Sequence, residues 1–290
     1  PVVTSFSILG DVAKQVGGER VNVSNLVGPD QDAHAYNLTS RDMQRIRNAK
    51  LVLVNGLGFE QAAVMRGIHQ SGVPFAEATK NIQPMKAEDH DDDDHDHDHD
   101  HDHKHDHDHK EEEPEVDEHV WTSLKNAKEI TEKILKAALE FDKAEEKKLS
   151  ENTKNYTDKI AAVDQKIGEM VKTAKRKEII VGDRFPLRYF VDDYGIKYYA
   201  AFPGCSEQTE ANVKTVSFLV KKIKEDKIPA VFKIELSNGL IAETLAKETG
   251  AKILEIQSAH NVSEKDFESG VTYVDLMERN LEALKEALNS

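Results

Sequence analysis

Hydrophobic positions in the first part of the chain alternate between the period of a strand and the period of a helix. Apolar residues at every second position predict strands, and apolar residues three or four positions apart predict one face of a helix. Ser40 stands where the cap of a helix is expected. The predicted strands are Val2–Phe6, Val21–Val27 and Leu51–Val54, and the predicted helices are Ile8–Gly17, Ser40–Ala49 and Phe59–His69.

The last third of the chain repeats this alternation of strand and helix patterns. Gly250 follows the helical pattern of Asn238–Glu248 and predicts its end. The predicted strands are Glu178–Val181, Ile196–Phe202, Ala230–Lys233 and Lys252–Ile256. The other predicted helices are Leu187–Tyr194, Asn212–Glu225 and Tyr273–Leu288.

Two helical patterns, about Ser123–Leu139 and Glu145–Ala174, separate these parts. The second carries one apolar stripe made by Leu149, Tyr156, Ile160, Val163, Ile167, Met170 and Ala174. A helix of this length spans about 45 Å. Two βα units joined by one long, rigid helix predict an α/β protein with two Rossmann-like lobes. We expect a first lobe over 1–142, a connecting helix over 143–176 and a second lobe over 177–290, with the ligand in the cleft between the lobes, beyond the carboxyl ends of the strands.

The segment from about 86 to 117 has a different composition from the rest of the chain. Between Glu88 and Glu118 there are 18 acidic residues and two lysines, against 54 acidic and 39 basic residues in the whole chain. The remainder is therefore close to neutral, although the net charge of the chain is −15. With almost no apolar residues to bury, this segment is predicted to be a disordered loop inserted in the first lobe.

The 290 residues are enough for two domains of ordinary size. No apolar run approaches the about 20 residues that cross a bilayer. The chain begins at Pro1 rather than Met, which predicts that a signal segment has been removed. The one cysteine, Cys205, excludes an internal disulfide and is expected to be a small buried residue. No basic stripe points to nucleic acid, and we expect a monomer.

Four of the 13 histidines lie outside the acidic segment. His34 follows a predicted strand of the first lobe and His260 follows a predicted strand of the second, so both can face the cleft. His119 lies where the apolar pattern resumes, whereas His69 lies late in a helix and is expected to face solvent. Imidazole is the commonest metal ligand, and a cleft lined by His34, His119 and His260 favours zinc, copper or nickel over manganese.

The sequence resembles the zinc and manganese solute-binding proteins of ABC transporters, the ZnuA-like family. The resemblance covers nearly the whole chain except the acidic segment. It is carried by GPDQDAHAYNLTSRDMQRIRNAKLVLVNGLGFE, DEHVWTSLKNA, VFKIELSNGLIAETLAKETGAKILEI and GVTYVDLMERNLEALKEAL. It implies two α/β lobes joined by a long helix, and it implies metal ligation by His34 and His119.

Two positions depart from the family pattern. The place of the usual third histidine reads IIVGDRFPLRYF and holds Asp183 and Arg184 instead. We expect His260 to replace the missing imidazole and Asp183 to be the fourth ligand, with Glu207, Glu235 or a water as alternatives. Three imidazoles and one carboxylate suit tetrahedral zinc and leave no open position for a substrate. Tyr36 and Trp121 flank the histidines and are expected to wall the site.

Histidines in the acidic segment recur at every second position over most of its length. A flexible chain can fold two or three of them round a cation, and the acidic residues raise the local cation concentration. An expression tag would not lie inside the chain interleaved with aspartate. We therefore expect weak, exchangeable metal sites at His90, His95, His97, His99, His101, His103, His105, His107 and His109.

Together these features predict an extracytoplasmic zinc receptor, periplasmic or lipid-anchored, that delivers Zn²⁺ to the membrane permease of an ABC importer. Manganese or nickel is the alternative metal. A metal store acting through the His-rich segment is a second hypothesis. A zinc hydrolase is a third, and the sequence lacks a supporting motif such as HExxH. We therefore expect a transport protein and no enzyme.

Overall fold

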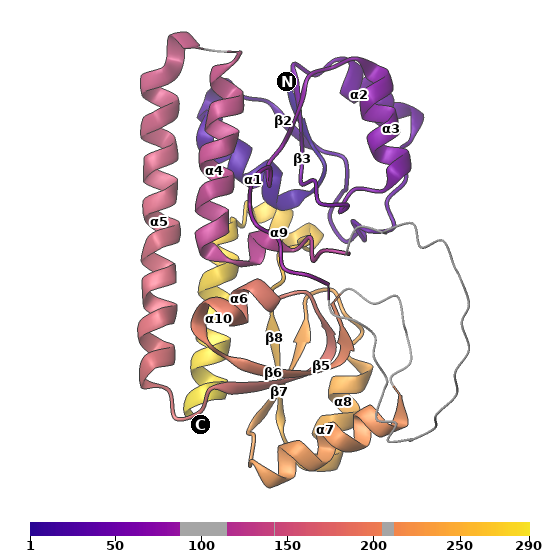
Figure 1. Cartoon of the computed structure of the whole chain (residues 1–290), viewed down its shortest axis with the longest axis vertical. Helices are drawn as coiled ribbons and strands as arrows, with labels where there is room; N and C mark the ends of the chain where they lie inside the picture. Colours follow the sequence, from indigo (N-terminus) through magenta and orange to yellow (C-terminus); the bar gives the residue numbers. More distant parts are fainter. Residues whose placement is uncertain (88–114, 142, 205–211) are drawn as a thin grey trace, which may run out of the picture.

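The computed structural model describes residues 1–87, 115–141, 143–204 and 212–290. Residues 88–114 of the predicted loop, with its nine histidines, and the residues Cys205 and Glu207 lie outside the described residues. Within these ranges the chain forms two α/β lobes, one above the other, with a long helix beside both (Figure 1). The predicted fold class is confirmed. No helix of the described ranges is long and apolar enough to cross a membrane.

The first lobe holds a parallel sheet in the order β2-β1-β3-β4. Alternate residues of β3 point to opposite faces: Leu51 and Leu53 join the main core, whereas Val52 and Val54 pack under α2 and α3. Its elements are β1 (Val2–Thr4), α1 (Ser7–Gly17), a 3₁₀ turn (Gly18–Arg20), β2 (Val23–Asn25), α2 (Ser40–Arg47), β3 (Leu51–Val54), α3 (Ala62–Ser71) and β4 (Phe75–Glu77).

Two details of this lobe differ from the sequence prediction. The cap of α2 is Thr39 rather than Ser40, because Thr39 and Asp42 exchange hydrogen bonds in a capping box. Strand β4 was not predicted, since its three residues lie at the edge of the sheet with Phe75 and Glu77 exposed.

The second lobe repeats the strand arrangement with a parallel sheet in the order β6-β5-β7-β8. Gly182 in β5 is required there, because a Cβ atom would lie 2.6 Å from the Cα of Ala242 in α8. The short helix α9 was not predicted. The elements are β5 (Glu178–Phe185), α6 (Arg188–Tyr194), β6 (Lys197–Pro203), α7 (Val213–Glu225), β7 (Ala230–Ile234), α8 (Leu240–Thr249), β8 (Lys252–Ile256), α9 (Glu264–Ser269) and α10 (Tyr273–Asn289).

The lobes are connected by a 3₁₀ turn (Val120–Thr122), α4 (Leu124–Leu139), a second 3₁₀ turn (Lys143–Glu145) and α5 (Glu146–Thr173). Helix α5 has 28 residues, and it packs against α1, α4 and α10. Its buried stripe follows the prediction from Leu149 to Ile167 and then ends at Val171 instead of Met170 and Ala174. The largest hydrophobic cluster runs through both lobes, so their inner faces share one core.

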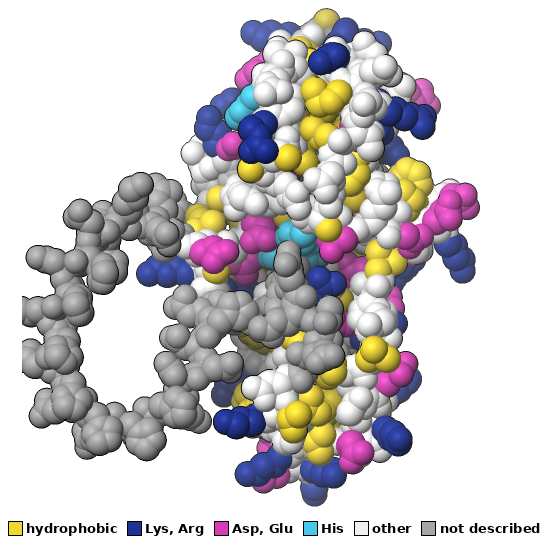
Figure 2. Space-filling view, turned by 90° about the vertical axis from the view of Figure 1, so that its right-hand side faces the viewer, with side chains coloured by type: hydrophobic (Ala, Val, Ile, Leu, Met, Phe, Trp, Pro, Cys, Tyr) yellow, Lys and Arg dark blue, Asp and Glu magenta, His cyan; other side chains and the backbone are white. Residues whose placement is uncertain are grey.

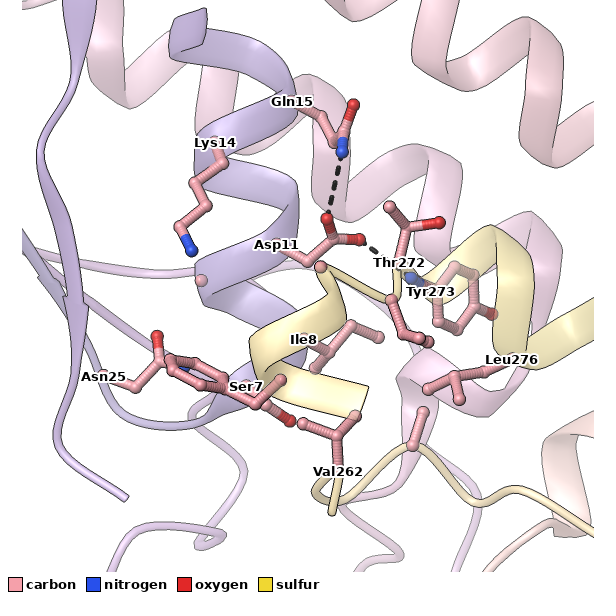
Figure 3. Close-up of a pocket in the computed structure, with 15 residues that line it drawn as sticks. Ser7, Ile8, Asp11, Lys14, Gln15, Asn25, Val262, Thr272, Tyr273 and Leu276 are labelled. Atoms are coloured by element: carbon pink, nitrogen blue, oxygen red, sulfur yellow. Dashed lines mark hydrogen bonds between the residues drawn. The ribbon is translucent and has the colours of Figure 1, made fainter. Parts of the chain in front are cut away.

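Asp11 of α1 joins the first lobe to both the connecting helix and the last helix. Its carboxylate accepts hydrogen bonds from the Tyr156 hydroxyl (2.5 Å), the Tyr273 backbone N–H (2.9 Å) and the Gln15 amide (3.1 Å). Figure 3 shows Asp11 pointing from α1 toward the start of α10, beside Thr272. Burial raises the pKa of the Asp11 carboxyl. These bonds and the shared core make the lobe interface a packed one.

Candidate metal centre

His34 lies in the long loop between β2 and α2. Its backbone is fixed at two points: its N–H donates to Asp32 Oδ1 at 2.9 Å, and its carbonyl accepts from the Gln61 amide at 2.6 Å. The ring is half-buried and meets the edge of the Phe59 ring at a centroid distance of 4.9 Å. Backbone bonds and an aromatic wall therefore set the position of this imidazole.

His119 is held by the residue two positions before it. Its ring Nδ1 lies 2.7 Å from Asp117 Oδ1, and its side chain is only 3% exposed. Burial alone would raise the pKa of the Asp117 carboxyl, but the hydrogen bonds and charge of His119 hold that pKa below its ordinary value. A carboxylate on Nδ1 fixes the proton there and leaves the Nε2 lone pair for a metal.

His260 follows β8 and is held through a hydroxyl. Its Nδ1 lies 2.6 Å from Ser258 Oγ, and that hydroxyl donates to Glu235 Oε1 at 2.5 Å. The Ser258 N–H donates to the other carboxylate oxygen at 2.7 Å. Burial raises the pKa of Glu235 to about 7, against the opposing effect of the Ser258 hydrogen bonds. Because the hydroxyl proton goes to Glu235, Ser258 Oγ accepts the Nδ1 proton of His260.

The Nε2 atoms of these three rings converge. His34 Nε2 lies 3.1 Å from His260 Nε2 and 3.4 Å from His119 Nε2. Nitrogens that share one tetrahedral zinc ion are about 3.3 Å apart. Figure 2 shows histidine side chains at the waist between the lobes, flanked by acidic side chains. The three rings therefore have the spacing that a single small cation requires.

The protonation states of the rings also suit a metal. Burial, and then the neighbouring charge of His119, lowers the pKa of His34 to about 4. The same two causes lower the pKa of His260 well below its ordinary value. Both rings are therefore neutral at neutral pH.

Aromatic rings close the inner side of the centre. Trp121 is fully buried, and its ring centroid lies 5.3 Å from those of His119 and His260. Its indole N–H donates to the Ser258 carbonyl at 2.9 Å, which ties the two lobes together. The Tyr36 hydroxyl donates to Asp42 at the start of α2. His69 lies on α3 against Phe75.

The structure does not bring Asp183 to the three rings. Its carboxylate accepts from the backbone N–H groups of Arg184 (2.8 Å) and Ile234 (3.4 Å). One ring nitrogen of each of the three histidines lies within 4.8 Å of the other two. Among the described residues no carboxylate or thiol joins that group. Glu235 is likewise occupied by Ser258.

Glu118 and Arg184 lie at the centre, although the sequence prediction gave neither a role. Glu118 Oε1 is 3.7 Å from His119 Nε2 and 3.8 Å from His34 Nδ1. Arg184 borders a cavity of about 160 Å³ that His34, His260 and Glu235 also line. The sequence did offer a signal for Glu118, since it is the direct neighbour of a predicted ligand.

Comparison with known proteins places the whole chain in one group. Residues 2–287 match a family described as "Zinc-uptake complex component A periplasmic". The chain is 28% identical to the high-affinity zinc uptake system protein ZnuA of Bacillus subtilis, over 99% of this chain and 87% of that protein. It is 25% identical to the manganese ABC transporter substrate-binding lipoprotein ScaA of Streptococcus gordonii, over 99% and 88%. The crystal structure of the metal-dependent lipoprotein YcdH of Bacillus subtilis has the same fold, with a TM-score of 0.80, 24% identity and coverage of 99% and 98%.

Proposed function

Because the chain belongs to the family of periplasmic zinc-uptake components, we propose that it is an extracytoplasmic receptor that captures Zn²⁺ and delivers it to the permease of an ABC importer. A member of this family is a substrate-binding receptor and not an enzyme. The observation that carries the proposal is the convergence of three imidazoles from two lobes at metal-sharing distances.

In this proposal His34, His119 and His260 bind the ion through Nε2. Glu118 rather than Asp183 takes the fourth position, because its carboxylate already lies within 4 Å of two of the rings. In this proposal the half-buried Glu118 side chain turns toward the ion, whereas Asp183 is bonded to backbone N–H groups. The ion is cargo, so every ligand position can come from protein.

Manganese is the alternative cargo, since a manganese lipoprotein is among the relatives. The donor set argues for zinc, because manganese favours oxygen ligands and three of the four proposed donors are imidazole nitrogens. Nickel accepts the same nitrogens and stays a further alternative. Loading the protein from an equimolar mixture of the three ions, followed by elemental analysis, distinguishes these cargoes.

The proposal is tested by replacing each proposed ligand with alanine and measuring zinc affinity by competition with a chelator. Loss of an outer partner of a ligand lowers metal affinity about 10- to 100-fold, so loss of a ligand itself should exceed about 100-fold. His69→Ala is the matched control, because His69 lies on α3 away from the centre. Unchanged affinity in the His34, His119 and His260 variants contradicts the receptor proposal.

A further inference from the structure

Arg184 stands beside the proposed metal centre with a fixed backbone. It is the second-last residue of β5, and its N–H donates to Asp183 Oδ1 at 2.8 Å. The half-buried side chain borders the cavity of about 160 Å³ next to His34 and His260. The Arg184 side chain therefore shares a cavity with two proposed ligands.

Among the described residues no carboxylate lies within ion-pairing distance of the Arg184 guanidinium. Asp30, Asp32 and Glu235 line the same cavity, and their carboxylates accept from Glu264 N–H, His34 N–H and Ser258 respectively.

A positive charge on the wall of this cavity disfavours a metal cation bound by the histidines that line it. Coulomb energy is proportional to charge, so a divalent ion experiences twice the repulsion of a univalent ion at the same place. Partial burial strengthens this repulsion, because the effective dielectric constant is lower than in water.

We infer that Arg184 sets the affinity of the centre, holding it below the limit that its imidazoles and Glu118 allow, so that the ion can leave for the permease. This inference rests on the proposed function. It assigns opposite effects to two charged neighbours of the centre: Glu118 attracts the ion and Arg184 repels it.

The test is Arg184→Met, which removes the charge and keeps an unbranched side chain of similar reach. We expect zinc affinity, measured by chelator competition, to rise at least tenfold, with slower release of zinc to the chelator. Arg184→Lys keeps the charge and should stay closer to wild type. Arg47→Met is the control, because Arg47 is exposed on α2. A gain of affinity cannot result from a damaged fold, and Arg184→Gln serves as a second variant without the charge.

The dependence on ion charge separates repulsion from other effects. If the energy is Coulombic, the gain in affinity for Zn²⁺ should be about the square of the gain for Ag⁺ in the same variant. Equal gains for both ions overturn the inference.

Two further results overturn it. Unchanged zinc affinity in both charge-free variants means that Arg184 does not act on the ion. Lower affinity at a wild-type melting temperature means that Arg184 holds an anion that binds with the metal. In both cases the proposed function still stands if zinc binding by the wild type depends on His34, His119 and His260. A wild-type protein that does not bind zinc contradicts the proposed function itself.

Discussion

In the first lobe a carboxylate holds the ring of His119 directly, whereas in the second lobe a hydroxyl stands between His260 and its carboxylate. A direct carboxylate fixes the ring and also raises the basicity of its Nε2 atom. A hydroxyl fixes the ring equally well but passes on less of the carboxylate charge. The two lobes therefore contribute unequally to the proposed centre, although their sheets have the same strand arrangement.

The neighbouring charges extend this difference. The first lobe adds Glu118, which lies within 4 Å of two rings. The second lobe adds Arg184, which borders the cavity that His34 and His260 line. The first lobe thus provides two imidazoles with acidic support, and the second provides one imidazole beside a positive charge. We expect the ion to be held mainly by the first lobe and enclosed by the second.

The largest effect expected from this comparison is that of removing Asp117. Asp117→Ala should lower zinc affinity about 10- to 100-fold, because the outer partner of a ligand is lost. Ser258→Ala should lower it by less than about tenfold, since the hydroxyl mainly orients the ring of His260. Chelator competition measures both affinities. Asp117 also lies 3.6 Å from Arg188, so a melting curve of the metal-free variant is the control for folding. A larger loss of zinc affinity in Ser258→Ala than in Asp117→Ala contradicts this prediction.

Sequence periodicity was sufficient to predict the two lobes and the long helix. His34 and His260 could be placed at the cleft because each follows a predicted strand, and ligands bind beyond the carboxyl ends of parallel strands. Ligation by His119 was implied by the family resemblance. The charged residues at the centre could not be predicted. The register of β5 against β6 shifts between Val181 and Arg184, and such an irregularity re-aims side chains in a way that strict alternation does not predict. The sequence prediction therefore chose Asp183, whereas Arg184 borders the cavity.

Glu118 was missed for a different reason. It lies in an irregular segment between the isolated bridge at Val116 and the 3₁₀ turn that starts at Val120. Periodicity gives no side-chain direction in such a segment. In the sequence, nothing distinguishes Asp117 and Glu118 from the acidic residues before them. Only the three-dimensional contacts show that Asp117 lies at Nδ1 of His119 and Glu118 near its Nε2.

A smaller effect concerns the interface that keeps the two lobes in place. The raised pKa of Asp11, caused by burial, means that the folded protein binds this proton more tightly than the unfolded chain. Its contribution to stability is therefore present at low pH and is lost as the pH rises through the raised pKa. Asp11→Asn removes the titration, and its oxygen can still accept from Tyr156 and Tyr273. We expect the free energy of unfolding of wild type to fall relative to that of Asp11→Asn as the pH rises from the ordinary aspartate pKa of 3.8 through the raised pKa of Asp11. Urea unfolding at several pH values measures it, and a constant difference contradicts the prediction.

The smallest effect on the tight site, the proposed centre at His34, His119 and His260, is expected from removing the acidic segment. Only the first lobe carries this segment. The ends of this segment lie side by side, because Ala87 N–H donates to the Glu115 carbonyl at 2.8 Å and Lys86 pairs with Val116 in an antiparallel bridge. Residues 88–114 can therefore be replaced by Asn-Gly, the pair that favours a two-residue hairpin turn.

Since His34, His119 and His260 are all retained in this variant, the affinity of the tight site should stay within about twofold of wild type, as expected for distant changes. The number of zinc ions bound per chain, counted by equilibrium dialysis and elemental analysis, should fall toward one because the nine histidines of the segment are gone. A scrambled segment of the same composition is the control for length and charge. Loss of the tight site on deletion would instead favour a metal store that acts through the segment, and the unequal support of the two lobes would then have no bearing on how the metal is held.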